Sequence, residues 1–105
     1  MIHDIRQKFL DGLVEFTQHA VDRSIIRRIS LDEIRQAIAS GEVIEEYPDD
    51  RYGPSCLVFG YSLEDRPLHV QCSYPDRPLL KVITAYQPDP ALWINFRTRR
   101  SSNGV

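Results

Sequence analysis

The sequence predicts an α+β domain with two or three N-terminal helices packed on one face of a four-stranded antiparallel meander sheet. All seven prolines lie at or after Pro48, so nothing interrupts helices in the first half. The second half alternates short apolar runs with turn-forming residues, which is typical of strands joined by hairpins. Helices followed by strands favour a layer of helices on one side of an antiparallel sheet.

The first two helices are predicted from spacing and capping. Residues 2–11 carry apolar side chains at helical intervals, and Gly12 is expected to end that helix. Residues 13–16 leave two alternatives open, an extended entry into the next helix or an edge strand. Thr17 is suited to cap a second helix over residues 18–28, because its hydroxyl can accept a free backbone N–H.

A third helix is predicted over residues 31–40. Ser30 followed by Glu33 fits the capping box, in which each side chain accepts a backbone N–H of the other residue. Gly41 is suited to the position after the helix, where a left-handed backbone is expected.

Four strands are expected after this helix, at residues 42–47, 55–63, 67–74 and 79–87. Pro88 and Pro90 end the last strand. Trp93 and Phe96 are expected to fold back onto the body, because large aromatic side chains are mostly buried. The domain is therefore predicted to span residues 1–96, followed by a mobile basic tail at 97–105.

Composition and charge exclude several classes of protein. The chain has 105 residues, 42% hydrophobic and 27% charged, which suits one globular domain. No apolar run approaches the ~20 residues of a membrane-spanning helix, so no membrane contact is expected. The charged N-terminus argues against a secretion signal, and the two cysteines make no disulfide framework. We therefore expect a cytoplasmic protein.

Neither a metal ion nor another cofactor is expected. His69 and Cys72 are three residues apart, so a regular strand points them to opposite faces. The sequence contains no C-x-x-C, H-E-x-x-H, phosphate-binding glycine loop or G-x-S-x-G elbow.

Two-residue turns would place Leu57 opposite Cys72, with His69 between Gly60 and Thr84. Alternation then directs Leu57, Phe59 and most other apolar strand residues toward the helices. The opposite face is left open and chemically mixed, with Glu45, Tyr47, His69, Gln71, Ser73, Thr84 and Tyr86. On the second helix, His19, Arg23 and Arg27 form a polar ridge at four-residue intervals.

Four segments together resemble a known family. They are His19-Ala20-Val21-Asp22-Arg23, Gly41-Glu42-Val43-Ile44-Glu45-Glu46-Tyr47-Pro48, Pro67-Leu68-His69-Val70 and Ile83-Thr84-Ala85-Tyr86-Gln87-Pro88-Asp89. Their order and spacing resemble the domain-of-unknown-function family 4258 over about residues 14–93. That family is similar to the RelE/BrnT-type toxins, small α+β proteins of which many cut messenger RNA and are held inactive by an antitoxin.

The resemblance implies metal-free cleavage of RNA, with an antitoxin-like partner. Those toxins are usually strongly basic, whereas this chain has a net charge of −2. Such cleavage needs a proton acceptor, a proton donor and a cation at the phosphate. His69 is the candidate general acid or base, Tyr86 could donate a proton or orient a phosphate, and Arg23 could clamp a phosphate.

Further residues have both a functional and a structural interpretation. Glu45 or Glu46 could act as the base, and alternation allows only one of them to join the site. His19 and Arg23 could join the site or tie the helix to one of these carboxylates. For His69 the structural alternative is a partly buried histidine bonded to a neighbour.

Arg27, Tyr47 and Tyr52 are candidates for contacts with nucleic acid, because arginine binds phosphate and tyrosine stacks on bases. The structural alternative for the tyrosines is packing at the rim. Two functions are therefore carried forward. One is an endoribonuclease-like domain, and the other is a non-catalytic module that docks a partner protein or nucleic acid, as a monomer or homodimer.

Overall fold

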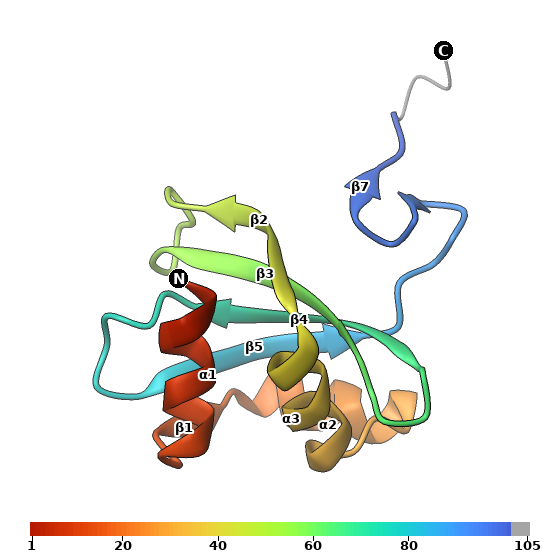
Figure 1. Ribbon diagram of the computed structural model, residues 1–105. Helices are drawn as coiled ribbons and strands as arrows, with labels where there is room; N and C mark the ends of the chain where they lie inside the picture. Colours follow the sequence, from red (N-terminus) through yellow and green to blue (C-terminus); the bar gives the residue numbers. More distant parts are fainter. Residues whose placement is uncertain (102–105) are drawn as a thin grey trace.

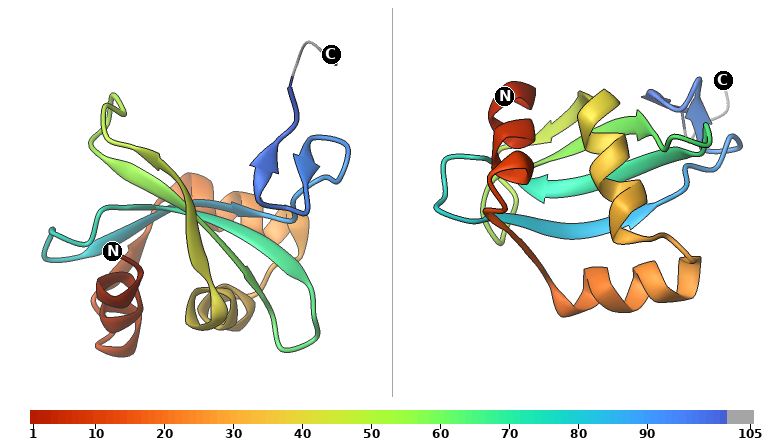
Figure 2. Two further views of the ribbon diagram at one scale, coloured as in Figure 1. Left: turned by 45° about the horizontal axis from the view of Figure 1, so that its top comes forward. Right: turned by 60° about the horizontal axis from the view of Figure 1, so that its bottom comes forward.

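A computed structural model describes residues 1–101 as a twisted sheet with helices on one side and a small C-terminal hairpin on the other (Figure 1, Figure 2). The helices in this range are α1 (Ile2–Leu10), α2 (Gln18–Arg27) and α3 (Leu31–Ser40). The main sheet contains β1 (Val14–Phe16), β2 (Glu42–Tyr47), β3 (Ser55–Tyr61), β4 (Pro67–Ser73) and β5 (Leu80–Tyr86). The hairpin pairs β6 (Trp93–Ile94) with β7 (Thr98–Arg99). The predicted α+β class is confirmed.

The sheet has five strands in the order β1-β5-β4-β3-β2. Strands β2 to β5 form the predicted antiparallel meander. The expectation of four antiparallel strands was wrong at one edge, where β1 pairs parallel to β5. Of the two alternatives for residues 13–16, the edge strand is the one observed. Backbone bonds from Leu80 N to Leu13 O and from Thr17 N to Val82 O tie it to β5.

The predicted register between β3 and β4 was wrong by one residue. Leu57 pairs with Gln71 and Phe59 with His69, so Leu57 and Phe59 lie on the face away from the helices while Val58 joins the core. The reason is that every residue from Ser55 to Gly60 is buried, so apolar character does not reveal which face each side chain occupies. The register also shifts within β4–β5, and His69 pairs with Tyr86 rather than with Thr84.

Helices α1 and α3 pack under the sheet, whereas α2 runs alongside β5 (Figure 2). The helical layer therefore covers one face only in part. The Thr17 cap and the Ser30–Glu33 capping box are both confirmed. None of the helices within residues 1–101 is long and apolar enough to cross a membrane.

Two glycines let α3 lie close to the sheet. A Cβ atom at Gly60 would lie 1.9 Å from the Ala37 carbonyl oxygen, and one at Gly41 would lie 2.6 Å from the same atom. The backbone of Gly41 has φ −85°, so the predicted left-handed conformation is wrong. Glycine at position 41 instead avoids a steric clash. Left-handed backbone is found after the other two helices, at Gly12 after α1 and at Arg28 after α2.

The cysteines face each other across the β3–β4 pair on the helix-covered side. Cys56 and Cys72 are directly paired, fully buried and reduced, with their Sγ atoms 3.9 Å apart. The contact with the Cys56 thiol, together with burial, holds the pKa of the Cys72 thiol well above its usual range.

Part of the predicted mobile tail has a defined conformation. Residues 98–99 form β7, and Arg97 and Arg99 make ion pairs with β2. Hydrophobic patterning could not predict this ordered segment, because its contacts with β2 are made by the arginine side chains. Residues 102–105 lie outside the described residues.

We predict that Gly60→Ala lowers the free energy of unfolding by about 2–3 kcal/mol, because the added methyl group has no space against the α3 backbone. The measurement is urea unfolding followed by circular dichroism. Gly12→Asn is the control, because Gly12 has φ +69° with open space around it and asparagine tolerates that conformation. Equal stability of Gly60→Ala and the wild type would contradict the close approach.

Candidate functional site

The candidate site is the face of the sheet turned away from α1 and α3, which we call the open face. Its side chains come mainly from β3, β4 and β5, and the C-terminal hairpin covers one end of it (Figure 1). The uncovered remainder contains a central groove and an end pocket. These two depressions share Asp50.

His69 lies beneath the C-terminal segment with no exposed surface. Its Nε2 is 2.6 Å from the Phe96 carbonyl oxygen, and its Nδ1 is 3.2 Å from the Tyr86 hydroxyl. Because a carbonyl oxygen only accepts, Nε2 carries the proton and Nδ1 accepts from Tyr86. The Trp93 ring stands edge-on to the imidazole at 4.5 Å. This arrangement matches the structural alternative for His69, and the imidazole cannot touch a substrate in this conformation.

Burial is the main cause of a lowered His69 pKa, and the hydrogen bond to Phe96 opposes it only in part. The neutral imidazole is therefore the form that fits the folded protein.

Two arginines fasten the C-terminal segment to β2. Arg97 pairs with Glu42 and lies 4.8 Å from the centre of the Phe59 ring. Arg99 pairs with Glu45 at 3.1 Å and stacks on Trp93 at 4.6 Å. The predicted base Glu45 is thus engaged by a cation that the sequence interpretation had assigned to a mobile tail.

The central groove lies beside the covered end, with a volume of about 360 Å³. It is lined by Tyr47, Asp50, Leu57, Gln71, Tyr86 and Arg99. The Tyr47 hydroxyl donates to Glu45, and burial together with this bond raises the pKa of Tyr47 to about 12. Tyr86 is half-buried, and burial raises its pKa as well. Both phenols are therefore protonated at neutral pH and act as hydrogen-bond donors.

Arg27 connects α2 to the central groove. Its guanidinium lies 5.9 Å from the centre of the Tyr86 ring. It also donates to Thr84 Oγ1 at 3.2 Å and to the Ala85 carbonyl oxygen at 2.8 Å. Arg27, predicted to contact nucleic acid, and Tyr86, predicted to donate a proton or orient a phosphate, therefore contact each other at the central groove.

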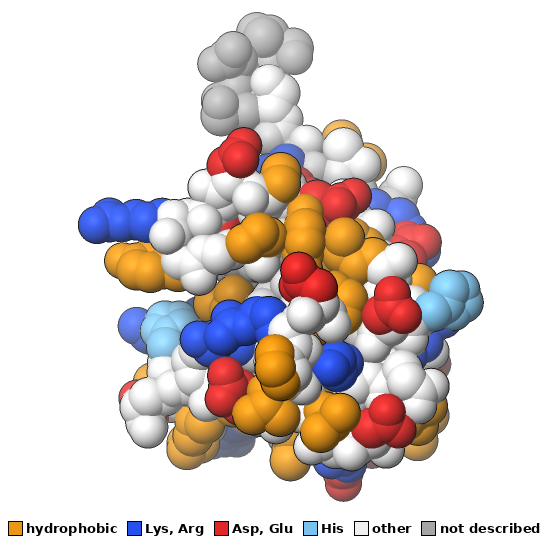
Figure 3. Space-filling view, turned by 90° about the vertical axis from the view of Figure 1, so that its left-hand side faces the viewer, with side chains coloured by type: hydrophobic (Ala, Val, Ile, Leu, Met, Phe, Trp, Pro, Cys, Tyr) orange, Lys and Arg blue, Asp and Glu red, His pale blue; other side chains and the backbone are white. Residues whose placement is uncertain are grey.

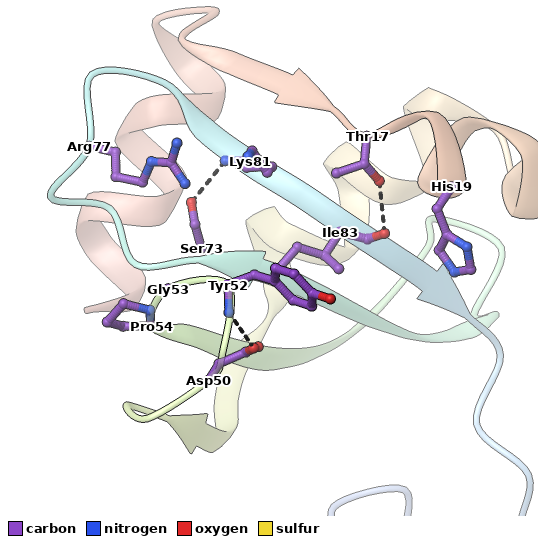
Figure 4. A pocket seen from close by; sticks show the side chains of 10 residues that line it. All are labelled: Thr17, His19, Asp50, Tyr52, Gly53, Pro54, Ser73, Arg77, Lys81 and Ile83. Carbon is purple, nitrogen blue, oxygen red and sulfur yellow. Dashed lines mark hydrogen bonds between the residues drawn. The ribbon is translucent and has the colours of Figure 1, made fainter.

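The end pocket has a volume of about 330 Å³ and lies between the start of α2, the β2–β3 loop and the β4–β5 turn (Figure 4). It is lined by Thr17, His19, Asp50, Tyr52, Gly53, Pro54, Ser73, Arg77, Lys81 and Ile83. His19 and Tyr52 were predicted site residues. Arg77 and Lys81 were missed, because no motif in the sequence connects the β4–β5 turn with α2.

The predicted polar ridge of α2 contributes unevenly to the site. His19 lines the end pocket, Arg27 contacts Tyr86 of the central groove, and Arg23, between them on the helix, is exposed. Within the described part of the chain, no ion pair joins this ridge to Glu45 or Glu46. Glu45 binds Arg99, and Glu46 accepts from the Tyr74 hydroxyl. The predicted tie between α2 and these carboxylates is therefore not made.

Charge on the molecule is mixed in sign. Figure 3 shows acidic, basic and hydrophobic side chains interspersed over one end of the molecule, without a continuous basic surface. Among residues 1–101, no group of three or more His, Cys, Asp or Glu side chains is arranged to hold a metal ion.

The fold and the site define this protein as an α+β domain in which one face of the sheet carries polar and aromatic side chains. The profile of the family described as domain of unknown function DUF4258 matches residues 16–87. The chain therefore belongs to this family, whose matched region contains α2, α3, β2 to β5 and the last residue of β1. It also contains both depressions of the open face except Arg99. Comparison with curated proteins and with solved structures gives no match.

We predict that the free energy of unfolding falls as the pH is lowered through 6.5, the ordinary pKa of histidine. The unfolded chain then binds a proton that the buried His69 resists, so the loss reaches at most about 1.4 kcal/mol per pH unit. The measurement is urea unfolding between pH 7.5 and 5. His69→Gln is expected to flatten this slope, and the exposed-residue control His19→Gln is expected to retain it. A slope unchanged in His69→Gln would contradict the assignment.

Proposed function

We propose that this protein binds single-stranded RNA on the uncovered part of the open face. The observation that carries the proposal is the convergence of three tyrosines with cations there: Tyr47 and Tyr86 in the central groove, and Tyr52 in the end pocket. Aromatic side chains stack on bases of any identity, and neighbouring cations attract the phosphates between them.

The distribution of charge supports a local contact rather than a general attraction to polyanions. The chain has a net charge of −2, yet Arg27 contacts Tyr86 at the central groove and Arg77 and Lys81 line the end pocket. Two or three phosphate contacts would give a salt dependence of log K with a slope of only about −1.4 to −2.1.

A protein partner of the antitoxin kind, implied by the likeness to RelE/BrnT-type toxins, would occupy the same face. Such a partner would compete with RNA, because both need the tyrosines and the groove between them.

We predict that Arg23→Glu weakens binding of a fluorescent 12-nucleotide RNA by about five- to tenfold at low salt, because it places a negative charge on α2 between His19 of the end pocket and Arg27, which contacts Tyr86. Fluorescence anisotropy measures the affinity. Arg35→Glu is the matched control, since Arg35 is an exposed arginine of α3 on the far side of the sheet. Absence of RNA binding by the wild type, or equal loss in both variants, would refute the proposed function.

Cleavage of the bound RNA is a second candidate, favoured by the bond between Tyr86 and His69. Tyr86 lines the central groove, and its hydroxyl proton points to the unprotonated Nδ1 of His69. A 2′-hydroxyl of RNA could pass its proton to Tyr86 as the Tyr86 proton moves to His69. The 2′-oxygen then forms a bond to phosphorus, the bond to the 5′-oxygen breaks, and the 5′-oxygen takes a proton from water. His69 gives its proton back through the Tyr86 hydroxyl to the hydroxide left behind. Arg27 or Arg23 would stabilise the phosphate charge.

We predict for this candidate that the wild type cleaves RNA in the presence of a chelator, leaving 2′,3′-cyclic phosphate ends. Tyr86→Phe should slow cleavage by at least about 100-fold, because it removes the proton-transfer group, while RNA affinity stays within about threefold of the wild type. Electrophoresis of end-labelled RNA gives the rate. A wild type that binds RNA without cutting it would leave only the binding role.

A further inference from the structure

The end pocket combines an apolar wall with cations that form no ion pair among the described residues. Tyr52 projects from the β2–β3 loop with 84% of its surface exposed. Ile83, from the bulged part of β5, lines the same pocket beside it (Figure 4). A flat ring inserted here would cover both side chains, which water otherwise contacts.

The two cations of the pocket are Arg77 of the β4–β5 turn and Lys81 of β5, and neither has an ion-pair partner within residues 1–101. His19 of α2 lines the same pocket. The Asp50 carboxylate also lines the pocket, where it accepts from the Tyr52 backbone N–H at 3.2 Å and from Ser55 Oγ at 2.9 Å. It forms no ion pair with Arg77 or Lys81 among the described residues, so these three side chains leave the pocket with a net positive charge that an anion would meet.

We infer that the end pocket binds one nucleoside monophosphate unit, with the base against Tyr52 and Ile83 and the phosphate at Lys81 and Arg77. A volume of about 330 Å³ suits a ligand of this size. The inference rests on the proposed function in one respect: the unit is a residue of the bound RNA strand. The pocket shares Asp50 with the central groove, so one strand can occupy both depressions.

The test measures two ligands, adenosine 5′-monophosphate by amide chemical shifts in NMR and the fluorescent 12-nucleotide RNA by anisotropy. Tyr52→Ala should weaken RNA binding about tenfold through lost stacking, and Tyr52→Phe should restore it. Lys81→Gln should weaken binding about threefold and reduce the salt slope by about 0.7. The mononucleotide should shift amide signals of residues around the pocket in the wild type, and these shifts should vanish in Tyr52→Ala.

Leu63→Ala is the control for Tyr52→Ala, because Leu63 is 83% exposed and lies away from the open-face depressions. If Arg23→Glu weakens RNA binding while Tyr52→Ala and Lys81→Gln match the wild type, the pocket inference is overturned and the proposed function stands. Mononucleotide binding that depends on Tyr52, without any RNA binding, would instead support a pocket for free nucleotides and overturn the proposed function.

Discussion

The hydrogen bond between His69 Nε2 and the Phe96 carbonyl is the contact on which the open face depends. It satisfies a polar ring that is otherwise packed between Trp93, Phe59 and Tyr86. It also holds the C-terminal segment where its aromatic rings cover β3. Burying an imidazole without a hydrogen-bond partner costs more free energy than one exposed hydrogen bond contributes to stability. The C-terminal segment and His69 therefore stabilise each other.

This contact divides the open face into a closed part and an accessible part. At the closed part, Arg97 and Arg99 form ion pairs with β2. Their guanidinium groups also stack on the Phe59 and Trp93 rings. In the accessible part, Arg77 and Lys81 have no such partner among residues 1–101. Under the proposed function, ligand contacts fall in the accessible part, and His69 would act there only through the Tyr86 hydroxyl.

Local signals predicted more of the fold than long-range ones. The capping residues Thr17 and Ser30 and the strands of the meander could be located because each depends on neighbours in sequence. The face occupied by Leu57 and Phe59 could not, since both sides of β3 are buried, one by helices and one by the hairpin. The candidate site followed the same rule. His19, Arg27, Tyr47, Tyr52 and Tyr86 line or border the two depressions, whereas Arg77, Lys81 and Arg99 join them through contacts that no motif encodes.

The buried thiols of Cys56 and Cys72 allow opening of the core to be measured by chemical labelling. Both sulfur atoms are sealed between the sheet and the helices, so a thiol-reactive dye reaches them only when the sheet separates from that layer. The labelling rate under native conditions therefore records how often the core opens. Because the chain has two cysteines in all, this signal comes from one place, the centre of the β3–β4 ladder.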